Sequence, residues 1–123
     1  KGGENYSLLK KSKFKKEQVN LILQDIINEI KTDTANSWSN YQSSESILDA
    51  TQAQVKAAEI ANEGITLEYD SGNTRTTLEV IQSRSLLLEA RISNALAKKD
   101  FSISKFELLA VIGELTLENI KKT

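Results

Sequence analysis

The side chains available for chemistry in this chain are carboxylates, lysines, tyrosines and hydroxyls, because its 123 residues include no histidine and no cysteine. Without imidazole or thiol, the usual zinc sites, Ser-His-Asp triads and Cys-His pairs are excluded. Two acidic pairs, Glu59 with Glu63 and Glu79 with Glu89, have the composition of an acid/base pair. Such pairs are common on exposed helix faces, so we expect no enzyme, no catalytic residue, no metal site and no cofactor.

The charges are almost balanced, with 16 Lys and Arg residues, 17 Asp and Glu residues and a formal net charge of −1. Nucleic-acid binding usually requires a clustered positive excess, so no nucleic-acid partner is expected. One local basic cluster lies near the amino end and consists of Lys10, Lys11, Lys13, Lys15 and Lys16. This cluster is either a solvated helix face or a contact for anionic lipid, and the sequence leaves both interpretations open.

The elements that must position these residues are long helices. The chain has no proline and five glycines, so few positions would force a helix to stop. Apolar residues recur at three- and four-residue steps, which predicts a long helix over about 5–69 and a second helix over about 76–113. Between them, residues 70–75 concentrate turn-forming types around Gly72 and Asn73. The sequence therefore predicts one all-α domain over 1–123, a long antiparallel coiled-coil hairpin with a short tail at 114–123.

Each predicted helix carries two apolar stripes. In the second helix, the first stripe is Leu87, Ala90, Asn94, Ala97, Phe101, Ser104, Leu108, Val111 and Leu115, and the second is Leu78, Ile81, Ser85, Leu88, Ile92, Ala95, Ser102, Phe106 and Leu109. In the long helix, the first stripe is Leu48, Val55, Ala58, Ile65 and Tyr69, and the second is Ala50, Ala53, Ala57, Ile60, Gly64 and Leu67. A lone hairpin covers one stripe per helix. The second stripes therefore predict self-association or membership in a closed ring of helices.

The predicted tip resembles the TolC family of outer-membrane efflux and type I secretion channels. The similar pattern is Tyr69, a small turn with Gly72, Arg75-Thr76, two small or apolar residues, Glu79 and then an apolar pair. Residues 86–91 and 107–115 also match family stretches, and Lys1-Gly2-Gly3 resembles the Gly-Gly at the end of a membrane strand. The chain has no Met and no apolar run of signal-peptide length, so we expect it to be a segment of a longer protein.

The resemblance implies a homotrimeric conduit with an outer-membrane β-barrel and a periplasmic α-helical barrel, to which each protomer gives two hairpins. This chain resembles the second hairpin, and it would form tunnel wall and periplasmic entrance in the outer membrane system of a Gram-negative bacterium. The implied partners are a periplasmic adaptor and an inner-membrane pump for drug efflux or type I secretion. The alternative from another class is a free-standing coiled-coil interaction or filament protein, which would have similar heptads but no reason for this tip.

The same resemblance assigns candidate roles at the tip. Tyr69 and Arg75 occupy places similar to those of residues that restrain the closed entrance, and Glu79 corresponds to an acid of the entrance ring. Gln82 lies where a second acid is often found, so its neutral side chain predicts a less negative gate. The alternatives are that Tyr69 covers the end of the first stripe, that Arg75 is a solvated turn residue, and that Glu79 compensates the helix dipole.

Three further residues form the tip that would dock the adaptor: Gly72, Thr76 and Leu78. Gly72 is expected to adopt a positive φ in the turn. A threonine hydroxyl is expected to cap the second helix, and the sequence does not choose among Thr74, Thr76 and Thr77.

Overall fold

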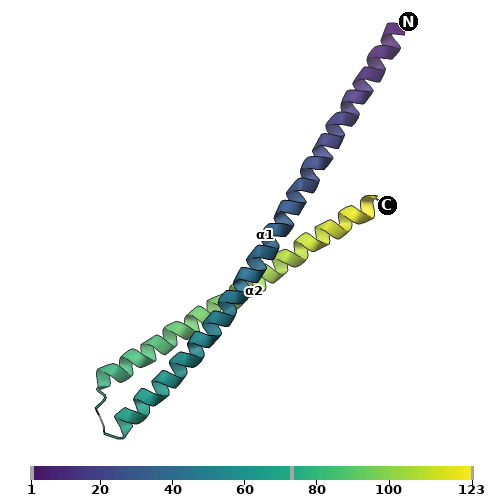
Figure 1. Ribbon diagram of the computed structural model, residues 1–123. Coiled ribbons are helices and arrows are strands. Elements are labelled where there is room, and N and C mark those ends of the chain that lie inside the picture. Colours follow the sequence, from purple (N-terminus) through teal and green to yellow (C-terminus); the bar gives the residue numbers. More distant parts are fainter. Residues whose placement is uncertain (1, 73, 123) are drawn as a thin grey trace. The chain divides into compact units, whose positions relative to one another are not determined.

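The computed structural model describes residues 2–72 and 74–122, with side-chain exposure described to residue 121. It contains α1, Gly2–Asp70, and α2, Thr77–Lys122, joined by a short turn (Figure 1). The two long helices pack against each other, which confirms the predicted all-α hairpin. Lys1 and Asn73 of the predicted motifs, and Thr123 of the predicted tail, lie outside the described residues.

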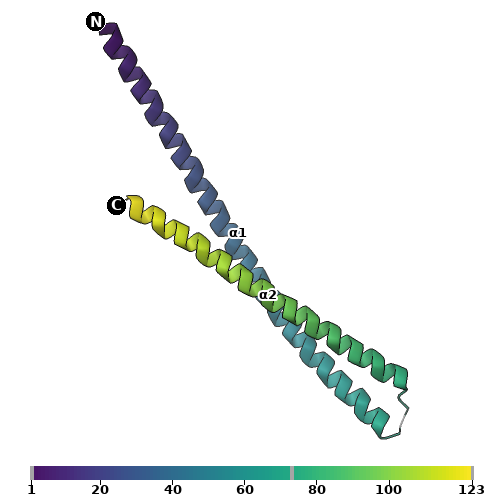
Figure 2. The same ribbon diagram turned by 180° about the vertical axis from the view of Figure 1, so that it is seen from behind.

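The chain divides into two compact units. Unit 1 comprises Lys1–Asn36 and Ala110–Thr123, and unit 2 comprises Ser37–Leu109. Unit 2 therefore contains the turn and the helix segments on either side of it, coloured teal and green in Figure 2. Unit 1 contains the amino-terminal part of α1 and the carboxy-terminal part of α2.

In unit 2 the first stripes of the two helices face each other and form the core. The buried apolar residues of this core are Val80, Leu87, Ala90, Ala97 and Leu108. On α1, the half-buried or buried residues of unit 2 follow the same three-four spacing, namely Ser37, Tyr41, Ser44, Leu48, Thr51, Val55, Ala58, Asn62 and Ile65, with Thr66 beside them. Burial thus identifies the first stripe of each helix as the interhelical face.

Polar pairs across the core set the register of unit 2. Ser83 Oγ donates to Asn62 Oδ1 at 3.3 Å, and Asn94 Nδ2 donates to Thr51 Oγ1 at 3.2 Å. In both pairs the two residue numbers add up to 145, as expected for an antiparallel hairpin that reverses near Gly72. Because a sliding helix would leave these groups unpaired, they favour one register over its neighbours.

The second helix does not end where the sequence predicted. The expected end near Gly113 and separate tail at 114–123 are wrong, because α2 continues through Gly113 to Lys122. A glycine inside a helix costs only about 1 kcal/mol relative to alanine. Gly113, between Ile112 and Glu114, does not have a positive φ. Among the described residues, a positive φ occurs at Gly72.

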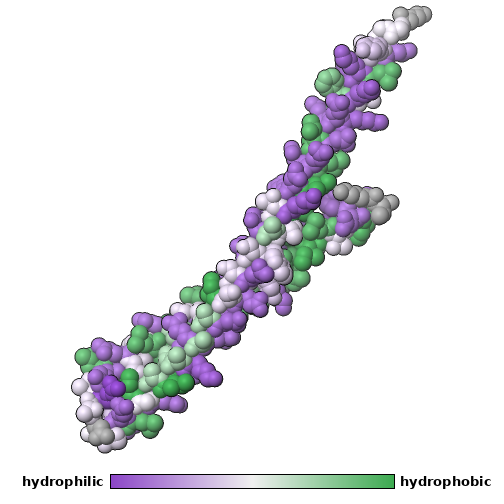
Figure 3. Space-filling model, viewed as in Figure 1, coloured by the Kyte–Doolittle hydropathy of each residue, from purple (hydrophilic) through white to green (hydrophobic). Residues whose placement is uncertain are grey.

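The second stripes remain on the surface of unit 2. Leu78, Leu88 and Ile92 of α2 are 63%, 59% and 52% exposed, and Ile60 and Leu67 of α1 are similarly exposed. Figure 3 shows hydrophobic side chains at the surface along both helices. Among the residues that the structure describes, neither helix combines the length and apolar character needed to cross a membrane.

Two adjacent leucines test which stripe stabilises the hairpin. Leu87 is 8% exposed and Leu88 is 59% exposed. We expect Leu87→Ala to lower the free energy of unfolding by about 2 kcal/mol or more, because it removes buried apolar volume. The control Leu88→Ala should change it by less than about 1 kcal/mol. Urea unfolding followed by circular dichroism, under conditions where sedimentation gives a single species, measures both; equal effects would contradict the assignment of the first stripe as the core.

Candidate functional site

The tip of the hairpin brings most of the predicted site residues together. On the α1 side of the tip, the helix ends in a turn at Gly72. Gly72 has φ of 77°, and its N–H donates to the Tyr69 carbonyl at 3.1 Å. The Ser71 hydroxyl donates to the Glu68 carbonyl at 2.9 Å, so carbonyls of the last turn are satisfied locally. The predicted positive φ of Gly72 is confirmed.

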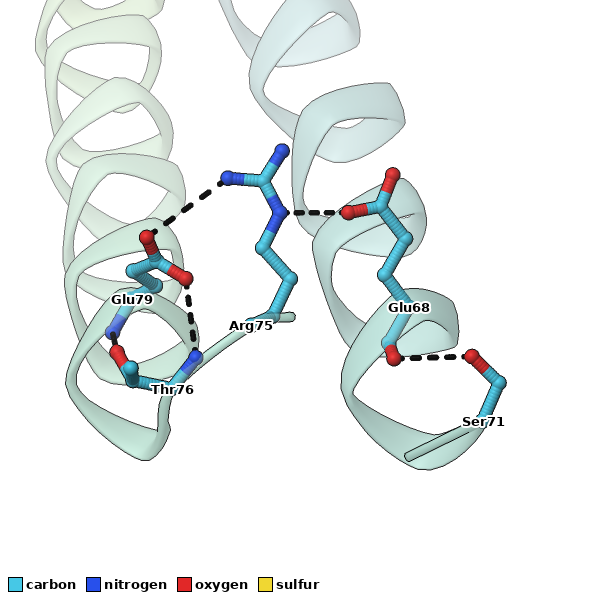
Figure 4. Close-up of polar contacts among 5 residues, drawn as sticks. All are labelled: Glu68, Ser71, Arg75, Thr76 and Glu79. Atoms are coloured by element: carbon cyan, nitrogen blue, oxygen red, sulfur yellow. Dashed lines mark hydrogen bonds and ion pairs between the residues drawn. The ribbon is translucent and has the colours of Figure 1, made fainter. Parts of the chain in front are cut away.

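A reciprocal pair of hydrogen bonds starts α2. The Glu79 N–H donates to Thr76 Oγ1 at 3.2 Å, and the Thr76 N–H donates to Glu79 Oε2 at 3.0 Å (Figure 4). This is a capping box, in which the hydroxyl and the carboxylate each satisfy an otherwise unpaired helix-end donor. Of the three threonines left open by the sequence, Thr76 is therefore the one that caps the helix. Glu79 also places a negative charge in the first turn, where the helix dipole favours it.

Arg75 connects the end of α1 to the start of α2. Its Nε donates to Glu68 Oε2 at 2.5 Å, and its Nη1 lies 3.9 Å from Glu79 Oε1, as Figure 4 shows. The hydrogen bond to Glu68 is the main cause that raises the pKa of Arg75, followed by the negative charge of Glu68 and then that of Glu79. Arg75 is therefore held inside its own hairpin by two carboxylates.

Tyr69 makes a second contact across the tip. Its hydroxyl lies 3.2 Å from Thr77 Oγ1, and the residue remains 41% exposed. The tyrosine thus ends the first stripe of α1 while its hydroxyl reaches the first residue of α2. This geometry fits the alternative in which Tyr69 covers the end of the first stripe. The exposed part of its side chain remains free to contact a neighbour.

A shallow groove of about 250 Å³ lies between the helices just behind the tip. Its floor is made of small or apolar side chains and its rim carries the charged tip residues, the full lining being Ala58, Ala61, Ile65, Arg75, Glu79, Gln82, Ser83 and Leu86. Three of the four gate candidates, Arg75, Glu79 and Gln82, therefore border one groove, together with Ile65 of the first stripe of α1. Leu78 lies outside it and is exposed as part of the second stripe.

Sequence reasoning did not single out Glu68 or Thr77 as partners of the tip residues. Glu68 precedes Arg75 by seven positions and the turn lies between them, so the usual helical spacing of an ion pair gave no signal. Among the described residues, no group of three or more acidic side chains is arranged to hold a metal ion.

One curated protein is similar to almost the whole chain. The outer membrane efflux protein BepC of Brucella suis biovar 1 (strain 1330) is 23% identical over 119 residues, which is 97% of this chain and 26% of BepC. The chain thus spans about a quarter of that protein. No family model matches the chain, and no solved structure matches it. The similarity is thus a distant one, to part of a protein that is named an outer membrane efflux protein.

The capping box predicts a difference between two threonines of the turn. We expect Thr76→Ala to lower the free energy of unfolding by about 1 kcal/mol, because a helix-end N–H loses its acceptor. Thr74→Ala is the matched control, since the Thr74 hydroxyl has no hydrogen bond within the described residues. Glu79→Gln should retain much of the cap, because an amide oxygen also accepts the Thr76 N–H. Equal unfolding midpoints for the two threonine variants would contradict the assigned cap.

Proposed function

We propose that this chain is a helical hairpin of the periplasmic tunnel wall of an outer-membrane efflux channel. In the channel it would act within a homotrimer, with its tip at the periplasmic entrance and in contact with a periplasmic adaptor that links to an inner-membrane pump. The proposal carries over the roles implied by the sequence resemblance, and the distant similarity to an outer membrane efflux protein supports it. It assigns no catalytic activity and no cofactor to the chain.

The observation that carries the proposal is the position of the second stripes. With about 100° per residue, the second stripe of each helix in unit 2 lies about 150° around the axis from the first stripe. A compact four-helix bundle needs its neighbours at roughly right angles. A helix in a wall instead needs one neighbour on each of two nearly opposite sides. The exposed second stripes, including Ile60 on α1 and Ile92 on α2, match the requirement of a wall.

The tip supports an entrance role through its fixed charges. Glu68 and Glu79 flank Arg75, and all three side chains remain about 40–50% exposed. In a trimer, three copies of this arrangement would surround the opening and leave an acidic excess at each tip. Oriented carboxylates at a narrow opening favour cations. Tyr69 would contribute its exposed ring to contacts between neighbouring tips, and Gly72, Thr76 and Leu78 would form the surface for the adaptor.

A chimeric channel tests the wall. The chain would replace the matched 119-residue segment of BepC, and export would be measured in cells lacking their own channel. We expect restored export that is lost with Ile92→Lys, because a charge would enter a packed face, and retained with Ser93→Lys one position away. The amount of chimera in the outer membrane is measured in parallel. A chimera that reaches the membrane and exports equally with Ile92→Lys would contradict the wall and favour a free-standing coiled coil.

The same chimera tests the entrance charge. Glu79→Gln keeps an oxygen for the helix cap and removes one negative charge from each tip. We expect the reversal potential in planar bilayers to shift toward lower cation preference, because three charges leave the opening. Glu89→Gln, on the same helix and away from the turn, serves as the control. Unchanged ion selectivity in Glu79→Gln would remove this residue from the gate.

A further inference from the structure

The amino-terminal end of α1 carries a charge opposite to that of the rest of the chain. Residues 5–16 hold five lysines and no acidic residue, whereas residues 17–123 hold 16 of the 17 acidic residues. The lysine cluster consists of Lys10, Lys11, Lys13, Lys15 and Lys16. These residues lie within about 9 Å along the helix axis, which is less than the screening length of about 10 Å in dilute salt. Their charges therefore act together on an anionic partner.

No carboxylate of the structure neutralises the lysine cluster. All five residues are exposed, and the ion pairs of the described residues are made by Arg75 and Arg91. At about 100° per residue, the five positions are distributed around α1 with no gap wider than about 100°. A neighbouring helix on one or two sides would therefore leave part of the cluster uncovered. Lys11 and Lys15 are four positions apart and repel each other, so an anion between them would be stabilising.

Apolar side chains are interleaved with the lysines. Tyr6, Leu8 and Phe14 are 68%, 65% and 61% exposed. An open groove of about 680 Å³ on this part of α1 is lined by Leu8, Lys11, Ser12, Phe14, Lys15 and Gln18. Two cations and two apolar groups thus share one face, and Figure 3 shows hydrophilic and hydrophobic side chains mixed along this segment. The surface of a bilayer offers the matching chemistry, phosphate headgroups next to the ends of acyl chains.

An anionic membrane fits this surface better than a nucleic acid does. Arginine is the preferred residue for nucleic-acid recognition, and this end of the chain contains lysine and no arginine. Exposed leucine and phenylalanine gain nothing from a phosphate backbone, whereas they can enter the boundary between headgroups and acyl chains. The acidic remainder of the chain is repelled by an anionic surface, so contact through the amino-terminal end is favoured over other orientations.

We infer that residues 5–16 of α1 form a contact site for a bilayer that contains anionic phospholipid. The phosphates lie near the lysine cluster, and Leu8 and Phe14 contact the acyl chains on the face that carries Lys11 and Lys15. In an assembly of like-oriented hairpins the site lies at the same end of every copy, so all copies would contact one membrane. The inference concerns the amino-terminal end of α1 and does not rest on the proposed function.

Vesicle binding by the 123-residue chain tests the inference. Co-sedimentation compares vesicles of equal parts phosphatidylcholine and phosphatidylglycerol with vesicles of phosphatidylcholine alone, at physiological ionic strength. We expect roughly tenfold more bound chain with phosphatidylglycerol, because each lysine is attracted to the negative surface. Binding should fall as salt is added, because the charges are screened. Equal binding to both kinds of vesicle, or binding to neither, would overturn the inference.

Substitutions in the same assay locate the contact. Replacing all five lysines of the cluster by glutamine preserves helix propensity and should reduce binding to the anionic vesicles roughly tenfold or more. The matched control has the same net charge and replaces five other exposed lysines, namely Lys31, Lys56, Lys98, Lys99 and Lys105. It should retain most of the binding. Circular dichroism verifies that both variants are as helical as the unchanged chain, and equal losses in the two would refute the site.

Two further measurements separate a membrane contact from simple charge attraction. L8S/F14S leaves the charge unchanged and should weaken vesicle binding several-fold, because the apolar contact with the acyl boundary is lost. Undiminished binding of this variant would contradict the apolar part of the site. A short DNA duplex is offered as a competitor for the anionic vesicles. Tighter binding of the duplex than of the vesicles would overturn the assignment of a membrane as the partner.

Discussion

The structure depends on the contact between the first stripes of α1 and α2. A helix such as α1, Gly2–Asp70, gains most of its stability from packing and not from the propensity of its residues. In unit 2 the contact is made largely by small or polar residues, such as Ala90, Ala97 and Ser83, so the two helices bury limited apolar surface. The hairpin is consequently incomplete as a hydrophobic structure, and its second stripes remain available to stabilise a larger assembly.

The residues that reverse the chain at the tip also hold its exposed charges in place. Gly72 ends α1, and the Thr76–Glu79 capping box begins α2. Arg75 joins both ends through Glu68 and Glu79. Glu79 therefore serves two purposes, since one carboxylate oxygen caps the helix and the other lies near the arginine. The charge of Glu79 can be removed without removing the cap, because glutamine retains an oxygen that accepts the Thr76 N–H.

Periodicity was sufficient to predict the helices, the reversal at Gly72 and the residues of the two stripes, because these depend on spacing along one chain. It did not identify the stripe that becomes the core, since both stripes are apolar; burial of Leu87 and exposure of Leu88 make that distinction. The prediction that the second helix ends at Gly113 was wrong, because helix-forming residues on both sides offset the low helix propensity of the glycine. The Glu68–Arg75 contact was missed because it depends on how the turn folds back, which local spacing does not encode. The gate and docking roles remain proposals.

The polar residues in the core are best understood through register. The pairs Asn62–Ser83 and Thr51–Asn94 contribute less stability than leucines would, but they become unpaired when the helices slide. A slip of one heptad would still place the first stripes of the two helices in contact, because their three- and four-residue spacing repeats every heptad. It would move one helix by about 10 Å along the other. That movement would break the contacts of Arg75 and Tyr69 at the tip and misalign the second stripes. The register of the two helices therefore determines how the tip and the second stripes are positioned to meet neighbouring molecules. The small polar groups in the core favour that register over its alternatives.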